Sequence, residues 1–144
     1  MRQGRNRLRS LVAAVALIAS TGCWDSGPTL VKVSGRVTID GKPVTTGAVR
    51  FTPLQGRLSG GPLGQDGRFE LTCFESGDGA MPGKHLVTVY AAEPLGETAI
   101  RWHAPKKYSK PTTSGIEITI DEPTEDIEIE LTWGGQKGPY VERD

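Results

Sequence analysis

The chain has 144 residues, enough for one domain with its own core, and it contains 19 glycines and 10 prolines. So many turn-forming residues, with no stretch of helical periodicity, indicate an all-β protein. The formal net charge is zero, so nothing suggests nucleic acid, and we expect no nucleic-acid partner.

Residues 1–22 are typical of a signal peptide, which we exclude from the fold. Four arginines in the first nine residues precede an uninterrupted apolar run, Leu11–Ala19. These nine residues, at about 1.5 Å each in a helix, cannot cross a hydrocarbon core of about 30 Å. The run therefore predicts a signal-peptide core and not a lasting membrane helix.

The run ends in Ser20-Thr21-Gly22-Cys23, which resembles a bacterial lipobox with Ser20 at the position where Leu is usual. The resemblance implies cleavage before Cys23, a diacylglyceryl thioether on its sulfur and acylation of the new N-terminus. Two or more acyl chains give stable anchoring where one is marginal. The alternative is an ordinary signal peptide that leaves Cys23 as a plain cysteine.

Without residues 1–22 the chain keeps 13 basic and 17 acidic residues, a net charge of −4. The acidic residues concentrate in 121–130, where we expect a solvated strand face. Residues 23–30 comprise Cys23 and a seven-residue tether, which reaches about 25 Å at most. The domain that follows is therefore expected to stay close to the bilayer.

The stretch 31–53 is expected to form a strand, a tight turn and a second strand. Apolar residues and one glycine alternate with polar ones, the period of a half-buried strand; the first set is Val31, Val33, Gly35, Val37 and Ile39. Asp40-Gly41 supplies the turn, because both residue types tolerate positive φ.

The rest of the chain is predicted to form short strands separated by loops. In order, these are a glycine-rich loop (54–67), a strand (68–74), a loop (75–83), a strand (84–92), a long irregular stretch (93–115) and two closing strands (116–120 and 127–131). About seven alternating strands predict two antiparallel sheets with apolar faces inward, a β-sandwich over residues 31–133. The tail, 134–144, is expected to be mobile.

Several segments together resemble the carboxypeptidase regulatory-like domain, a transthyretin-like β-sandwich, in the form found in short bacterial envelope lipoproteins. The segments are VSGRVTIDGKPV (33–44), GAVRFTP (47–53), DGRF (66–69), GDGAMPGKHLVTV (77–89), PKKY (105–108) and TSG (113–115). The resemblance covers nearly all of residues 33–131 and implies fold more than activity. His85 departs from it, standing where an aromatic residue, usually Tyr, is expected.

The candidate ligand-binding residues lie in the long stretch 93–115. Trp102 and His103 are adjacent, and Tyr108 follows. An exposed indole and imidazole can stack on a sugar or a peptide; alternatively, Trp102 caps the sandwich as a packing residue. A loop of this length in a compact domain is usually functional or packed by its own side chains.

Other reactive side chains have simpler interpretations. His85 and Cys73 point inward by strand parity, which favours a core histidine and an inert buried thiol, although a ligand or base role for His85 and a Cys23–Cys73 disulfide stay open. No nucleophile–base motif or metal-ligand spacing is present, so we expect no catalytic residue, no metal and no cofactor. A ureide hydrolase with a transthyretin-like fold ends in Tyr-Arg-Gly-Ser, which this chain lacks.

The sequence thus favours a non-catalytic lipoprotein of the bacterial cell envelope, facing the periplasm or the exterior. Its expected partners are membrane lipid, through Cys23, and an envelope protein or polysaccharide. The alternatives are a glycan- or peptide-binding module that uses residues 93–115, and a hydrolase with His85 or His103 as its base.

Overall fold

A computed structural model describes residues 27–143 of the protein, almost all of them in strands, turns and loops. The elements are β1 (Val33–Ile39), β2 (Lys42–Pro43), β3 (Ala48–Pro53), β4 (Ser59–Pro62), β5 (Arg68–Glu70), β6 (Gly83–Tyr90), β7 (Ala92–Pro94), β8 (Ala99–Trp102), a 3₁₀ turn η1 (Lys106–Ser109), a one-turn helix α1 (Pro111–Ser114), β9 (Ile116–Ile120), β10 (Thr124–Leu131) and β11 (Tyr140–Arg143). The predicted all-β, sandwich-like fold is confirmed.

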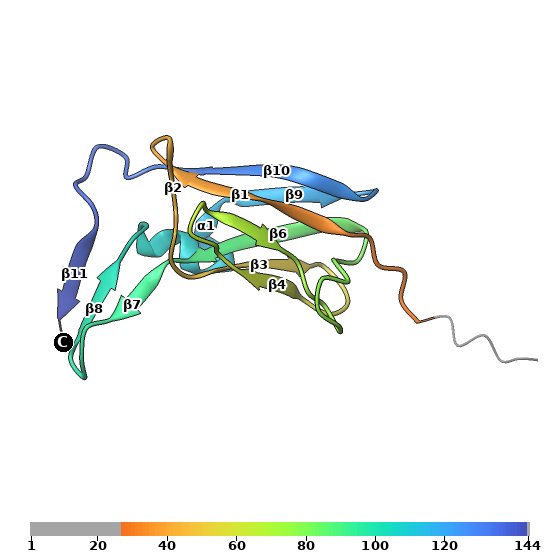
Figure 1. Ribbon diagram of the computed structural model, residues 1–144, viewed down its shortest axis with the longest axis horizontal. Helices are drawn as coiled ribbons and strands as arrows, with labels where there is room; N and C mark the ends of the chain where they lie inside the picture. Colours follow the sequence, from red (N-terminus) through yellow and green to blue (C-terminus); the bar gives the residue numbers. More distant parts are fainter. Residues whose placement is uncertain (1–26, 144) are drawn as a thin grey trace, which may run out of the picture.

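Two four-stranded sheets form the layers of the sandwich (Figure 1). One sheet has the order β10-β1-β2, with β5 also paired to β1, and the other has the order β4-β3-β6-β9. A third sheet, β11-β8-β7, lies at one end of the molecule. Residues 27–32 leave the sandwich at the opposite end.

Alternating side chains from both layers fill the core. The first layer contributes Val33, Val37, Ile39, Phe69, Ile129 and Leu131; the second contributes Val49, Phe51, Val87, Val89 and Ile120. Period-two alternation therefore identifies the inward faces of β1, β3, β6 and the second half of β10, because successive strand residues point to opposite sides.

The hairpin predicted for 31–53 is much shorter than expected. Asp40 and Gly41 have φ values of 47° and 81°, which suits a two-residue turn between Ile39 and Lys42. Pairing stops at Pro43, however, and the chain crosses to the other layer, where β3 begins after Gly47. The second strand of the predicted hairpin thus belongs to the opposite sheet.

The prediction of purely antiparallel sheets is wrong at β1, which pairs with β10 in parallel from Gly35↔Ile127 to Ile39↔Leu131. The two closing strands, predicted at 116–120 and 127–131, lie in different layers. Strand β9 adds to β6, whereas β10 crosses to the other layer, where it runs alongside β1. Because the β9–β10 connection joins the two layers, β10 does not pair with β9. It pairs with β1 instead, and the two strands run parallel.

Three segments expected to be irregular contain strands. The glycine-rich loop holds β4, in which a Cβ at Gly61 would lie 2.1 Å from the Glu70 carbonyl oxygen. A strand in such close contact needs glycine and so shows no alternation. The stretch 93–115 contains most of β7, all of β8 and both helical turns, and the tail expected to be mobile forms β11. The strand predicted for 68–74 is shorter, ending at Glu70.

Phe51 and Phe74 make a matched pair for testing the core. Phe51 is fully buried against Phe69 (ring centroids 6.0 Å apart), whereas Phe74 is 51% exposed. We expect Phe51→Ala to lower the free energy of unfolding by about 3–5 kcal/mol, because it removes apolar contacts and leaves a cavity. Phe74→Ala should change it by less than about 0.5 kcal/mol. Urea denaturation measures both, and equal losses would contradict this assignment of the core.

Candidate functional site

The small sheet β11-β8-β7 positions the candidate site. Its middle strand, β8, places Trp102 opposite Ala92 on one side and opposite Tyr140 on the other. A tight turn joins β7 to β8, with the Leu95 N–H donating to the Ala99 carbonyl at 2.8 Å. The backbone of Trp102 is therefore held between two strands, and the residue is only 4% exposed.

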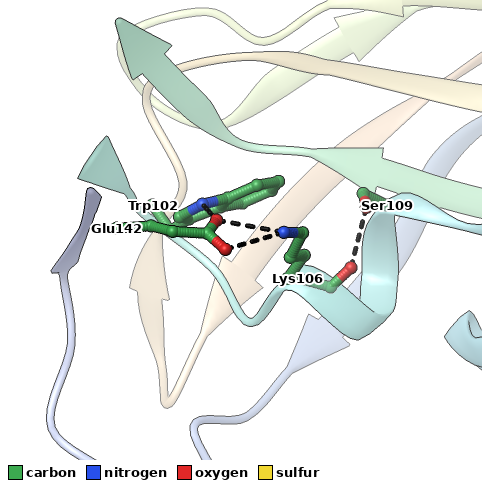
Figure 2. A network of polar contacts seen from close by, with 4 residues as sticks. All are labelled: Trp102, Lys106, Ser109 and Glu142. Carbon is green, nitrogen blue, oxygen red and sulfur yellow. Dashed lines mark hydrogen bonds and ion pairs between the residues drawn. The ribbon is translucent and has the colours of Figure 1, made fainter. Parts of the chain in front are cut away.

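A polar network ties this sheet to η1 (Figure 2). Trp102 Nε1 donates to Glu142 Oε2 at 2.9 Å, and Lys106 Nζ donates to both oxygens of the same carboxylate at 2.9 and 3.0 Å. The Lys106 ammonium also lies 5.6 Å from the centroid of the Trp102 ring. The Ser109 hydroxyl donates to the Lys106 carbonyl at 2.7 Å, which fixes the turn that carries the lysine.

Glu142 is held in its charged form. The hydrogen bond from Lys106, then that from Trp102, lowers the pKa of the carboxyl, and these effects outweigh the opposing influence of desolvation. A depressed pKa means that the contacts of the carboxylate stabilise the fold above the ordinary pKa and are lost as pH falls through the lowered one. The carboxylate is therefore present in the site at neutral pH.

Next to this network lies a groove of about 350 Å³. Its main lining residues are Tyr90, Ile100, Trp102, Lys106, Ser109 and Glu142. Tyr90 is 48% exposed and meets the Trp102 ring edge-on, with centroids 5.5 Å apart. The groove thus combines an exposed aromatic ring and an aliphatic side chain with a lysine, a hydroxyl and a carboxylate, a set suited to a ligand with one apolar and one polar face.

The three residues predicted to bind a ligand do not share one surface. Trp102 borders the groove, but of the two alternatives the exposed indole is wrong, because Trp102 is buried, with Tyr90 and Glu142 against its ring. Tyr108 is buried, and its hydroxyl lies 3.2 Å from the Thr132 amide nitrogen, which donates to it. Tyr108 therefore has a packing position.

His103 belongs to a different surface. Its Nε2 lies 3.2 Å from Glu93 Oε1, which also accepts a hydrogen bond from Arg101 at 2.9 Å. The hydrogen bonds from His103 and then Arg101 lower the pKa of Glu93. His103 also lines a second hollow, together with Trp133 and Pro139. His103 and the Trp102 groove are thus separate features.

Sequence reasoning missed Tyr90, Lys106 and Glu142 as site residues. Tyr90 had a usable signal, because it is the one aromatic side chain on the outward parity of the strand that carries Val87 and Val89. Glu142 had none, since it lies 40 residues from Trp102 in a segment too short to show a periodicity.

The remaining candidates lie elsewhere. Cys23 falls outside the described residues. Cys73 is a buried free thiol, as its parity predicted. His85 is fully buried beside Phe51, and its Nδ1 pairs with the Gly83 carbonyl oxygen at 2.9 Å. Burial lowers the pKa of His85 more than that bond raises it, so the ring is neutral inside the core.

Comparison with protein-family models, with curated proteins and with solved structures finds no match to this chain. Within residues 27–143, no three His, Cys, Asp or Glu side chains gather closely enough to hold a metal ion. The same part of the chain contains no helix of the length and apolarity needed to cross a membrane.

We expect the indole N–H of Trp102 to report the ionisation of Glu142. Its NMR resonance should titrate with a midpoint below 4.5, the ordinary value for a glutamic acid, because Lys106 and Trp102 favour the carboxylate. Glu142→Gln should abolish this titration, while Glu93→Gln, which removes the carboxylate beside His103, should leave it intact. A midpoint at or above the ordinary value would contradict the network.

Proposed function

We propose that this chain is a membrane-anchored, non-catalytic module of the bacterial cell envelope, whose sandwich presents the Tyr90 groove to a partner. The observation that carries the proposal is the run of arginines, apolar residues and small residues that ends at Cys23. It implies a lipid-modified cysteine at the head of the mature chain. The family resemblance to carboxypeptidase regulatory-like domains of envelope lipoproteins points the same way.

The arrangement of the two ends supports this proposal. Residues 27–32 leave the sandwich at one end, and β7, β8 and β11 lie at the other (Figure 1). Three residues separate Cys23 from Gly27, so a lipid on Cys23 keeps the first end near the bilayer. The groove then faces away from the membrane, where a periplasmic or extracellular partner has access.

The site chemistry supports a binding role over a catalytic one. The Ser109 hydroxyl donates to a backbone carbonyl, and the Glu142 carboxylate already accepts hydrogen bonds from Trp102 and Lys106. A nucleophile needs an adjacent base that receives its proton, an arrangement that these contacts do not provide. The groove is therefore suited to holding a ligand.

Lipid attachment at Cys23 predicts a clear difference between the two cysteines. Cells fed radiolabelled palmitate should label the wild-type protein and Cys73→Ala, and both should sediment with membranes. Cys23→Ala should lose the label and leave the membrane fraction, because the thioether forms on that sulfur. A Cys23→Ala protein that stays membrane-bound would contradict the proposal.

A second candidate function, glycan binding, is favoured by the exposed Tyr90 ring at the mouth of the groove. We expect peptidoglycan fragments or envelope polysaccharide to change Trp102 fluorescence, since Tyr90 contacts that indole edge-on. Tyr90→Ala should weaken binding about tenfold, equivalent to about 1.4 kcal/mol. Ile118→Ala, a change outside the groove on β9, serves as the control for altered stability. Unchanged Trp102 fluorescence with every glycan would exclude this function.

A further inference from the structure

The end of the sandwich where the N-terminal segment leaves carries an exposed apolar corner. Leu54 is 76% exposed, Phe74 51% and Leu58 48%, a high value for each of these large apolar side chains. They lie on the β3–β4 and β5–β6 loops, which Figure 1 shows at that end. We refer to Leu54, Arg57, Leu58 and Phe74 as the tether-end corner.

The two loops contact each other. The Arg57 guanidinium lies over the Phe74 ring, 5.0 Å from its centroid, and a hollow between the loops is lined by Arg57, Leu58, Gly60, Thr72 and Cys73. The same two loops also approach each other at Gly56, where an added Cβ would lie 2.5 Å from the Met81 sulfur. The β3–β4 and β5–β6 loops therefore pack together, with Arg57 and Phe74 in contact where they meet.

Phe74 is held outward by a well-defined loop. The Asp78 carboxylate accepts backbone N–H bonds from Cys73, Phe74 and Glu75 at 2.7, 2.9 and 2.8 Å. An aspartate that satisfies three successive amides fixes the backbone that carries the ring. The exposure of Phe74 is thus a property of the fold.

The N-terminal segment is attached to the same loop. Val31 and Ala80 exchange two backbone hydrogen bonds, at 2.9 and 3.0 Å, and Gly79 has φ 98° with no room for a Cβ beside the Val31 carbonyl oxygen. Eight peptide bonds link Val31 to Cys23, a reach of at most about 28 Å. The N-terminal segment and the tether-end corner therefore lie at the same end of the domain.

We propose that the tether-end corner rests on the lipid surface and orients the domain, with Leu54, Leu58 and Phe74 at the headgroup–acyl boundary and Arg57 among the headgroups. This inference rests on the proposed lipid anchor at Cys23. The anchor makes contact with the bilayer effectively intramolecular, so a small apolar corner suffices to set the orientation.

Charge selects which side of this end faces the lipid. The β9–β10 connection lies at the same end and carries Asp121 and Glu122, and the start of β10 adds Glu125 and Asp126. Anionic headgroups repel such a cluster, whereas they attract Arg57. The domain therefore leans on its apolar corner and turns the acidic connection away.

The experiment places one fluorescent probe at three exposed positions of the full chain, purified from membranes and reconstituted into phosphatidylethanolamine–phosphatidylglycerol vesicles. The background is Cys73→Ala, so that only the introduced thiol reacts with the nitrobenzoxadiazole reagent. Leu54→Cys reports on the corner, Glu122→Cys on the acidic connection at the same end, and Leu95→Cys on the opposite end. Vesicle flotation is measured on the same samples.

We expect a blue-shifted emission at position 54 and about twofold or greater quenching by doxyl lipid, as for a group at the headgroup–acyl boundary. Positions 122 and 95 should stay water-like. Floating protein with three water-like probes overturns the corner contact and leaves the anchor intact. A probe at 54 that is water-like on vesicles but protected in native envelopes means that a protein covers the corner, which also overturns the inference. Protein that does not float overturns both proposals.

Discussion

The structure depends on β1, the strand to which the remainder of its sheet is attached. Its backbone pairs with β10 in parallel and with β2 and β5 in antiparallel fashion. Its inward side chains, among them Val33 and Val37, belong to the core that the second layer covers. Because β1 follows directly after residues 27–32, the same strand also determines where the chain leaves the sandwich. Strand β1 thus organises its sheet and also sets the end of the sandwich at which residues 27–32 leave it.

The two ends of the sandwich are specialised differently. At one end Val31 is bonded to Ala80, beside a loop that displays Phe74. At the other end a small sheet closes over Trp102 and leaves Tyr90 exposed. Between them, the core is filled by alternating apolar residues of the two layers. A body of this kind holds the groove at a fixed distance from the end where residues 27–32 leave the sandwich.

Strand alternation and turn chemistry were the parts of the fold that the sequence could predict. The buried positions of His85 and Cys73 followed from parity, and Asp40-Gly41 marked its turn because positive φ favours these residue types. Neither signal says which strands become neighbours. Layer crossing at Gly47 and the parallel partner of β1 arise from distant contacts, which no local pattern records.

The candidate site was predictable only in part, for a related reason. Trp102 was predicted as a site residue because it is an aromatic residue in a long irregular stretch. Its indole N–H, however, donates to Glu142, which lies 40 residues away on another strand. The polar groups of the groove come from separate segments, and β11, which provides the carboxylate, consists of only four residues. Short strands at chain ends carry too few positions for a periodicity to be visible.

The same carboxylate couples the groove to the small sheet. Glu142 receives hydrogen bonds from Trp102 on β8 and from Lys106 on η1, so it fastens β11 to both. A ligand that contacts Lys106 or Glu142 in the groove interacts with groups that also hold the strand in place. If it strengthens those contacts, it stabilises β11, and by linkage a more stable β11 raises its affinity. Under the proposed binding role, strand pairing and ligand binding at this end of the molecule would thus be coupled through Glu142, which is supplied by β11.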